Sequence, residues 1–183
     1  MTPQTRKTLI YIVSSVDQAS YFEVLTPYLR DHNYDVEYLI LSSGETILER
    51  NLKKDGVRVT RIPFRNNRQF PLAIWQIYRY LRTHSHYAVH THLFEAGLAG
   101  IVAAQLAGSK RRICTRWHSN MHMLFHPHAV KYDRLCNRLA THIITPSVGT
   151  KQFLVGEEHV AESKVYPNEI GFDFPVARQR DRS

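Results

Sequence analysis

Histidines are concentrated in the middle of this sequence, where their rings could bind a ligand or a metal ion. Eight of the eleven fall between residues 84 and 128. His118, His122 and His126 are spaced by four residues, which would place them on one face of a helix, a pattern that can hold a transition metal. No cysteine or carboxylate completes an obvious set, and Pro127 breaks a helix just beyond. We therefore expect no metal site here, but a polar loop that faces a ligand.

The elements that must position these side chains follow from the hydrophobic pattern. Helical periodicity recurs at 74–81, 98–106 and 128–141. Short runs rich in β-branched residues predict strands at 9–13, 34–41, 57–64, 87–89, 112–115, 142–145 and 164–166. This alternation predicts an α/β fold, a Rossmann-like, doubly wound, mostly parallel sheet of about seven strands. The pattern stops after Phe174, so we expect one domain over residues 1–174 and a basic tail over 175–183.

Most of the polar clusters directly follow a predicted strand. In open α/β sheets, ligands bind beyond the carboxyl ends of the strands. We therefore expect one rim that suits a polar ligand such as a sugar. Its members are Ser14, Ser15, Ser42, Ser43, Arg65, His90, His92, Arg116, His118, Ser147 and Asn168. Of the two histidines on the fourth strand, we expect His90 to be structural and His92, nearer the rim, to contact the ligand.

The turn after the first strand argues against a dinucleotide cofactor. Residues 14–20 contain no glycine, so the Gly-x-Gly-x-x-Gly turn that lets the backbone approach a pyrophosphate is missing. We expect no bound cofactor.

Taken together, the motifs of residues 89–174 resemble the N-terminal domain of family 4 glycosyltransferases, which have the two-domain GT-B fold. The order of the motifs carries the resemblance: His90-x-His92, an Ala/Gly-rich helix, Thr115-Arg116 with His118, Asp133 before residues 135–140, Ile143 to Ser147, and Lys164 to Asn168. Two features depart from the family pattern. Trp117 is an additional residue before His118, and Asn168-Glu169-Ile170-Gly171 stands where the family has Asn-Gly-Ile-Asp.

The resemblance implies a hexosyltransferase of polysaccharide biosynthesis that transfers a sugar, with retention, from a nucleotide sugar to a saccharide or lipid-linked acceptor. In that scheme His118 contacts the transferred sugar as the catalytic residue, and the substrate-binding residues are His92, Arg116, Ser147, Asn168, Ser14 and Ser15. The second domain, which holds the nucleotide diphosphate in the family, is absent from this sequence. We therefore expect an acceptor-binding half, nearly inactive without a chain that supplies the donor domain.

The net charge of +8 and the pI near 9.7 favour contact with polyanions or with an anionic membrane. The arginines Arg58, Arg61, Arg65 and Arg68 precede Phe70 and Trp75, a pairing that suits a membrane surface as well as it suits a solvated basic edge. We expect a cytoplasmic protein, either free or peripheral to the inner face of the membrane, with Cys114 and Cys136 reduced. A non-catalytic module that binds a partner chain is the alternative, followed by a basic membrane- or nucleic-acid-binding module. Because no nucleic-acid recognition motif is present, we expect no nucleic acid.

Overall fold

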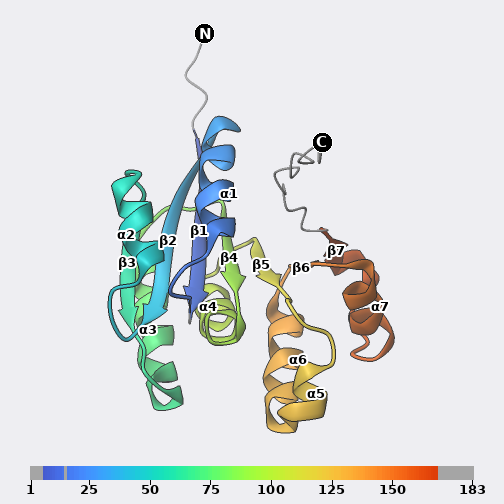
Figure 1. The fold of residues 1–183 in the computed structure, drawn as a ribbon. Helices are drawn as coiled ribbons and strands as arrows, with labels where there is room; N and C mark the ends of the chain where they lie inside the picture. The colour runs from blue at the N-terminus through green and yellow to red at the C-terminus, as the bar shows by residue number, and fades with distance from the viewer. Residues whose placement is uncertain (1–5, 15, 169–183) are drawn as a thin grey trace, which may run out of the picture.

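The computed structural model describes residues 6–14 and 16–168. Seven strands form one parallel sheet in the order β3-β2-β1-β4-β5-β6-β7 (Figure 1). They are β1 (Lys7–Ser14), β2 (Tyr34–Ser42), β3 (Arg58–Pro63), β4 (Ala88–His92), β5 (Arg112–Thr115), β6 (His142–Thr145) and β7 (Val165–Pro167). The prediction of a doubly wound parallel sheet of about seven strands is confirmed.

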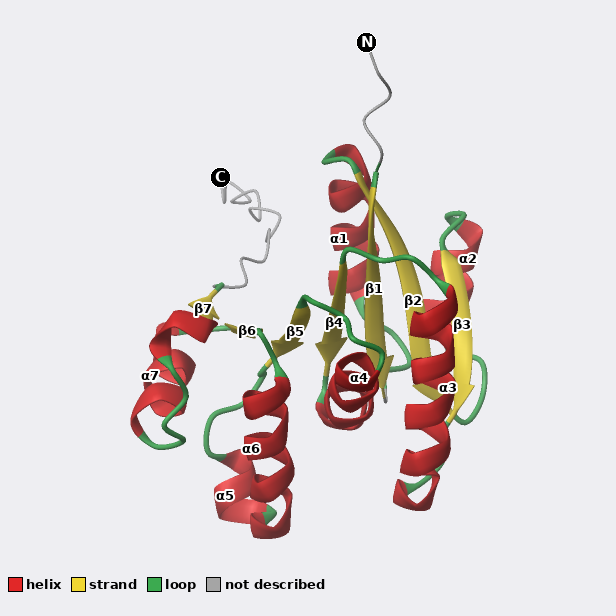
Figure 2. Ribbon diagram, turned by 180° about the vertical axis from the view of Figure 1, so that it is seen from behind, coloured by secondary structure: helices red, strands yellow, loops and turns green. Residues whose placement is uncertain are grey.

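Helices cover both faces of the sheet. They are α1 (Ser20–Asp31), α2 (Ile47–Lys54), α3 (Phe70–Thr83), α4 (Phe94–Leu106), α5 (Met121–Phe125), α6 (Val130–Leu139) and α7 (Val148–Gly156), with 3-10 turns at Asn67–Gln69, Pro127–Ala129 and Glu162–Lys164. Figure 2 shows α3, α4 and α6 on the near face, and α1 and α2 on the far one. The central helix, α4, contacts both α3 and α6.

The central strand β1 supplies both cores because successive side chains point to opposite faces. Ile10 and Ile12 pack with the cluster under α3 and α4. Tyr11 and Val13 pack with the cluster under α1 and α2, which includes Phe22. A strand buried on both faces needs this near-continuous apolar run, which is why it stood out in the sequence.

The strand order reverses beside β1, since the chain runs outward to β3 and then returns to β4 on the other side of β1. Such a reversal leaves a crevice beyond the carboxyl ends of the strands, the usual ligand position in open α/β sheets. The start of α4 lies at this point. The expected site therefore belongs at this end of the molecule.

The described helices include none long and apolar enough to span a bilayer. The predicted end of the domain at residue 174 and the basic tail 175–183 lie outside the described residues and stay predictions.

Small residues let α4 approach the sheet closely. A Cβ added at Gly100 would lie 2.7 Å from Thr91 Cγ2 and 2.9 Å from Ile12 Cδ1. One turn earlier, a Cβ at Gly97 would meet only Cys114 Sγ, at 4.0 Å. Of these two glycines, only Gly100 is required by the packing.

Replacing Gly100 by alanine should therefore lower the free energy of unfolding by about 1–3 kcal/mol, because the β-branched Thr91 cannot move aside easily. The matched change Gly97→Ala should be neutral or stabilise by up to about 1 kcal/mol, since alanine favours a helix. Urea unfolding of both variants measures the difference. Equal midpoints would contradict the close approach of α4.

Candidate functional site

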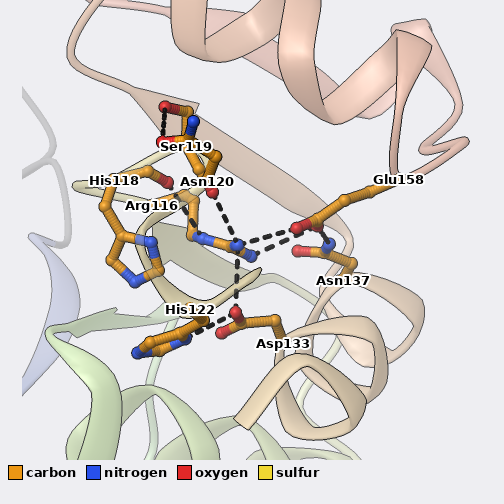
Figure 3. A network of polar contacts seen from close by, with 8 residues as sticks. All are labelled: Arg116, His118, Ser119, Asn120, His122, Asp133, Asn137 and Glu158. Carbon is orange, nitrogen blue, oxygen red and sulfur yellow. Dashed lines mark hydrogen bonds and ion pairs between the residues drawn. The ribbon is translucent and has the colours of Figure 1, made fainter. Parts of the chain in front are cut away.

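Arg116, which directly follows β5, holds this end of the sheet together. Its buried guanidinium donates through Nη2 to Asp133 Oδ2 at 3.0 Å and to Glu158 Oε1 at 2.8 Å. Nη1 reaches the other oxygen of Glu158 at 3.3 Å, and Nε donates to the His118 carbonyl at 3.1 Å (Figure 3). Asn137 donates to Glu158 Oε2 at 2.6 Å. We call these four side chains (Arg116, Asp133, Asn137 and Glu158) the arginine clamp; it joins the end of β5 to α6 and to the segment after α7.

His122, on α5, is held by the same aspartate. Its Nδ1 lies 2.6 Å from Asp133 Oδ2. If the carboxylate is ionised it can only accept, so Nδ1 carries the hydrogen of this bond. In Ser-His-Asp catalytic triads, an aspartate fixes the tautomer and orientation of the catalytic imidazole in the same way. His122 was in the histidine series noted from the sequence, but nothing there paired it with Asp133.

The ring of His118 packs against His122, with centroids 4.2 Å apart and ring planes at 64°. Its Nδ1 is buried and lacks a hydrogen-bond partner among the described residues. Burial first, and then the charge of Arg116 and the neighbouring His122, lower the pKa of His118. The imidazole is therefore neutral near pH 7 and can exchange hydrogen bonds with a hydroxyl group.

These side chains line a mostly apolar cavity of about 440 Å³ between the ends of β4 and β5. Phe94, Trp117 and Met121 contribute apolar side chains to its lining, and His118, His122 and Glu95 are among the polar ones. Of the site residues predicted from the sequence, Arg116 and His118 line this cavity. The donors of Arg116 are turned onto protein groups, so its contact with a ligand stays a prediction.

A second cavity, of about 770 Å³, lies beyond the ends of β1, β2 and β3. Its lining is largely polar and includes Ser42, Ser43 and Arg65, which were expected at the rim, and also Asp17 and Glu95. Glu95, at the start of α4, lines both cavities. A concave surface with several hydrogen-bonding side chains suits a hydroxyl-rich ligand.

His90 and His92 are two residues apart on β4, so their rings share one face of the sheet. His90 is buried and bonds Thr115 Oγ1 at 2.8 Å, which confirms its structural role. His92 lies deeper than expected: it is fully buried, stacks on Tyr11 and packs against Phe22. Neither ring nitrogen of His92 has a partner among the described residues. The expectation that His92 lines the cleft is therefore wrong for this structure, and its contact with substrate stays untested.

The connection from β4 to α4 is strained at Leu93, which has φ 70° and ψ 169°. Only glycine adopts this region readily, and such strain persists where the surrounding structure enforces it, often at functional sites. Leu93 lies between the unpartnered His92 and the cavity wall formed by Phe94. The unpartnered ring of His92 and the strained backbone of Leu93 therefore both lie next to the candidate site.

Ser14, Ser147 and Asn168, the remaining predicted residues that the structure describes, make local hydrogen bonds. Ser14 is buried, donates to Glu95 Oε2 at 3.0 Å and accepts from the Ala96 amide at 3.1 Å, so the expectation of a serine at the open rim is wrong. Ser147 caps α7 by accepting from the Thr150 amide at 3.1 Å. Asn168 is exposed, and its backbone N–H donates a hydrogen bond to the backbone carbonyl of Thr145. Ser15 lies outside the described residues, and ligand contacts of all four stay predictions.

A possible metal-binding group is more complete than the sequence suggested. The donor atoms of His118, His122 and Asp133 lie within 4.8 Å of one another, so a carboxylate from α6 does join the histidines. However, Asp133 Oδ2 already accepts from both Arg116 and His122. A cation there would have to displace the arginine or lie beside its positive charge. The expectation of no metal site stays a prediction.

Comparison with known proteins gives a consistent family and fold. The family model described as Glycosyltransferase Family 4 matches residues 18–170. A search of curated proteins finds no significant match. The chain is similar to the apo form of the lipopolysaccharide outer core galactosyltransferase WaaB, with a TM-score of 0.69 and 12% identity over 96% of this chain and 50% of that one.

Two further solved structures share the fold. MurG from Acinetobacter baumannii matches with a TM-score of 0.58 and 14% identity, over 77% of this chain and 42% of that one. A UDP-GlcNAc 2-epimerase from Neisseria meningitidis, bound to UDP-GlcNAc, matches with a TM-score of 0.69 and 15% identity, over 87% and 45%. The chain thus spans about half the length, or less, of these structures, and at such identities the likeness concerns the fold alone.

The buried histidines of β4 generate a prediction on pH. Burial lowers the pKa of His90 to about 3, and burial together with His90 lowers that of His92 well below its ordinary value. Below about pH 6.5 the unfolded chain binds protons that the folded chain excludes, so stability falls by about 1.4 kcal/mol per pH unit for each such histidine.

The variant His92→Phe should remove one of these two contributions. Its unfolding free energy should fall less steeply between pH 6 and pH 4, by about 1.4 kcal/mol per unit. At pH 8 the unfolding free energy of the variant should exceed that of the wild type by about 1 kcal/mol, because the substitution removes two buried ring nitrogens without partners. Urea unfolding at several pH values measures this, with the exposed His128→Ala as control. An unchanged slope for His92→Phe would show that this ring is not buried as a neutral group.

Proposed function

The chain belongs to glycosyltransferase family 4, and from that membership we propose that it forms the acceptor-side half of a two-domain hexosyltransferase. This enzyme transfers a sugar from a nucleotide sugar to a saccharide or lipid-linked acceptor, with retention of anomeric configuration. The similarity to a galactosyltransferase and to MurG, each about twice as long as the matched part, supports the proposal. A second domain, in the same or in a partner chain, completes the site.

The observation that carries the proposal is the cavity beside His118. A pyranose presents apolar C–H faces and a ring of hydroxyls, and this cavity combines apolar walls from Phe94, Trp117 and Met121 with two imidazoles. His118 is neutral near pH 7 because burial lowers its pKa. We assign it the contact with the transferred sugar, with His122 beside it.

Among the described residues, the lining of the same cavity offers no uncommitted lysine or arginine for a diphosphate. Arg116, the cationic side chain in its lining, already pairs with two buried carboxylates. Stabilisation of a leaving diphosphate needs preorganised charge or donors aimed at its oxygens. We therefore assign the donor's diphosphate to the second domain, and the larger polar cavity beyond β1 to β3 to the acceptor.

The function is tested at His118, after a donor domain has been supplied by fusion or in trans. His118→Ala should lower the rate of sugar transfer by about 10²-fold, the scale for losing one positioned hydrogen-bonding group. The free energy of unfolding should change by less than about 1 kcal/mol, because the residue is only half-buried. The matched control is His126→Ala, since His126 is exposed and lies outside the cavity lining.

Normal transfer per folded molecule in His118→Ala would refute its catalytic assignment. Failure of every nucleotide sugar to support transfer would favour a non-catalytic module that binds a partner chain. Calorimetry on the chain alone adds a check on the donor site. Micromolar binding of a UDP- or GDP-sugar would contradict its placement in a second domain.

A further inference from the structure

The short helix α5 and the first residues of α6 carry an unusual cluster of exposed apolar side chains. Met121, Met123, Leu124 and Phe125 are all exposed, Leu124 by 64% and Phe125 by 71%. Tyr132, on the next helix, is also exposed. Apolar side chains exposed singly are ordinary, but a contiguous group marks a surface that another phase or molecule covers. We call residues 121–125 and Tyr132 the α5 tip.

The exposed charges that flank the α5 tip along the chain are basic, while Glu95 shares the lining of the adjoining cavity with Met121 and His122. Between Glu95 and Asp133 the sequence contains no aspartate or glutamate. Asp133 itself is buried and engaged by Arg116 and His122. The exposed ionisable side chains next to the tip are His126, His128, Lys131 and Arg134. An apolar centre bordered by basic groups is complementary to the interface of a membrane with anionic lipids.

The position of the tip fits this partner. Figures 1 and 2 both show α5 beside the lower end of α6, at the end of the molecule to which the strands point. A protein partner would have to supply a surface that matches these side chains, whereas lipid headgroups and acyl chains adapt to exposed apolar side chains.

The basic surface suggested by the sequence, which runs from Arg58 to Trp75 and which we call the α3 edge, is less suited to this role. Arg58 pairs with Glu37 at 3.0 Å, and Arg61 pairs with Glu49 at 2.8 Å. Trp75 is half exposed, not in the core, but Arg79 lies over its ring at 4.8 Å. Two of the arginines that suggested a membrane-binding edge in the sequence are thus neutralised within the fold.

We propose that the α5 tip docks the chain on an anionic membrane. Leu124 and Phe125 enter the interface, and Lys131 and Arg134 lie at the level of the lipid phosphates. Met121 and His122 belong to α5 and also line the cavity beside His118. If the proposed function holds, docking brings that cavity to the membrane surface, and the acceptor is lipid-borne.

The test is co-sedimentation of the full chain with vesicles of phosphatidylcholine, with and without phosphatidylglycerol. The chain should bind the anionic vesicles, and Leu124→Ser with Phe125→Ser should weaken binding at least about tenfold. The matched control is Val24→Ser with Tyr28→Ser, since these α1 residues are similarly exposed. Replacing Leu72 and Trp75 by serine tests the α3 edge in the same way. Because all of these residues are exposed, melting temperatures should not change.

A second readout places the tip directly. In Phe125→Trp, fluorescence should shift to the blue on addition of anionic vesicles and not of neutral ones. The proposal is overturned if the wild-type chain does not bind anionic vesicles, if the α5 variant binds them like wild type, or if the α3 variant alone loses binding. It is equally overturned if the α5 variant only converts a dimer to a monomer, since the tip would then join two copies. None of these measurements needs sugar transfer, so they stand or fall separately from the proposed enzyme activity.

Discussion

The candidate site depends on one buried guanidinium. Removing Arg116 and its two carboxylates from water costs several kcal/mol for each ion, and only close, well-directed hydrogen bonds offset that cost. The structure provides them: Arg116 forks onto Glu158 and reaches Asp133, while His122 adds a bond to the same oxygen of Asp133 and Asn137 adds one to Glu158 Oε2. The parts joined in this way are the end of β5, α5, α6 and the segment after α7. Part of the lining of the cavity beside His118 comes from these same segments and depends on the clamp, and the rest comes from Phe94 and its neighbours at the start of α4.

Around this clamp the chain departs from local rules. His92 is buried without a partner for either ring nitrogen, and Leu93 adopts a backbone conformation that favours glycine. Each feature costs stability, and both lie where the strand order reverses. Elsewhere the fold follows simple preferences, such as the side-chain cap of α7 by Ser147 and the apolar strands of the centre. Local conflict at the end of a sheet where ligands bind is the pattern expected of a binding site.

Much of the fold could be predicted from the sequence, because its signals are local. The run Leu9 to Val13 is continuous and rich in β-branched residues, as expected of a strand buried on both faces. The alternation of such runs with helical patterns then sets the parallel order. The structural role of His90 was also accessible, since its place inside a strand implied burial.

The depth and the partners of the site residues were not accessible. The partners of Arg116 lie 17 and 42 residues away, and Ser14 meets Glu95 across 81 residues. No periodicity encodes such pairs. His92 lies at the end of its strand, where the sequence predicts exposure, yet α1 and Trp117 cover it. The exposure of the α5 tip could not be predicted either, because apolar residues in a short helix suggest burial until their surroundings are known.

The central claim is that the arginine clamp acts as one unit that holds the site in shape. A double-mutant cycle tests it most directly, through the unfolding free energies of Arg116→Met, Asp133→Asn and the double variant. Arg116→Met should cost about 3–5 kcal/mol, because it leaves buried carboxylates without their counter-ion. The double variant should be more stable than the sum of the single losses predicts, by about 1 kcal/mol or more. Additive losses would contradict the account, since they would mean that the two side chains stabilise the fold independently.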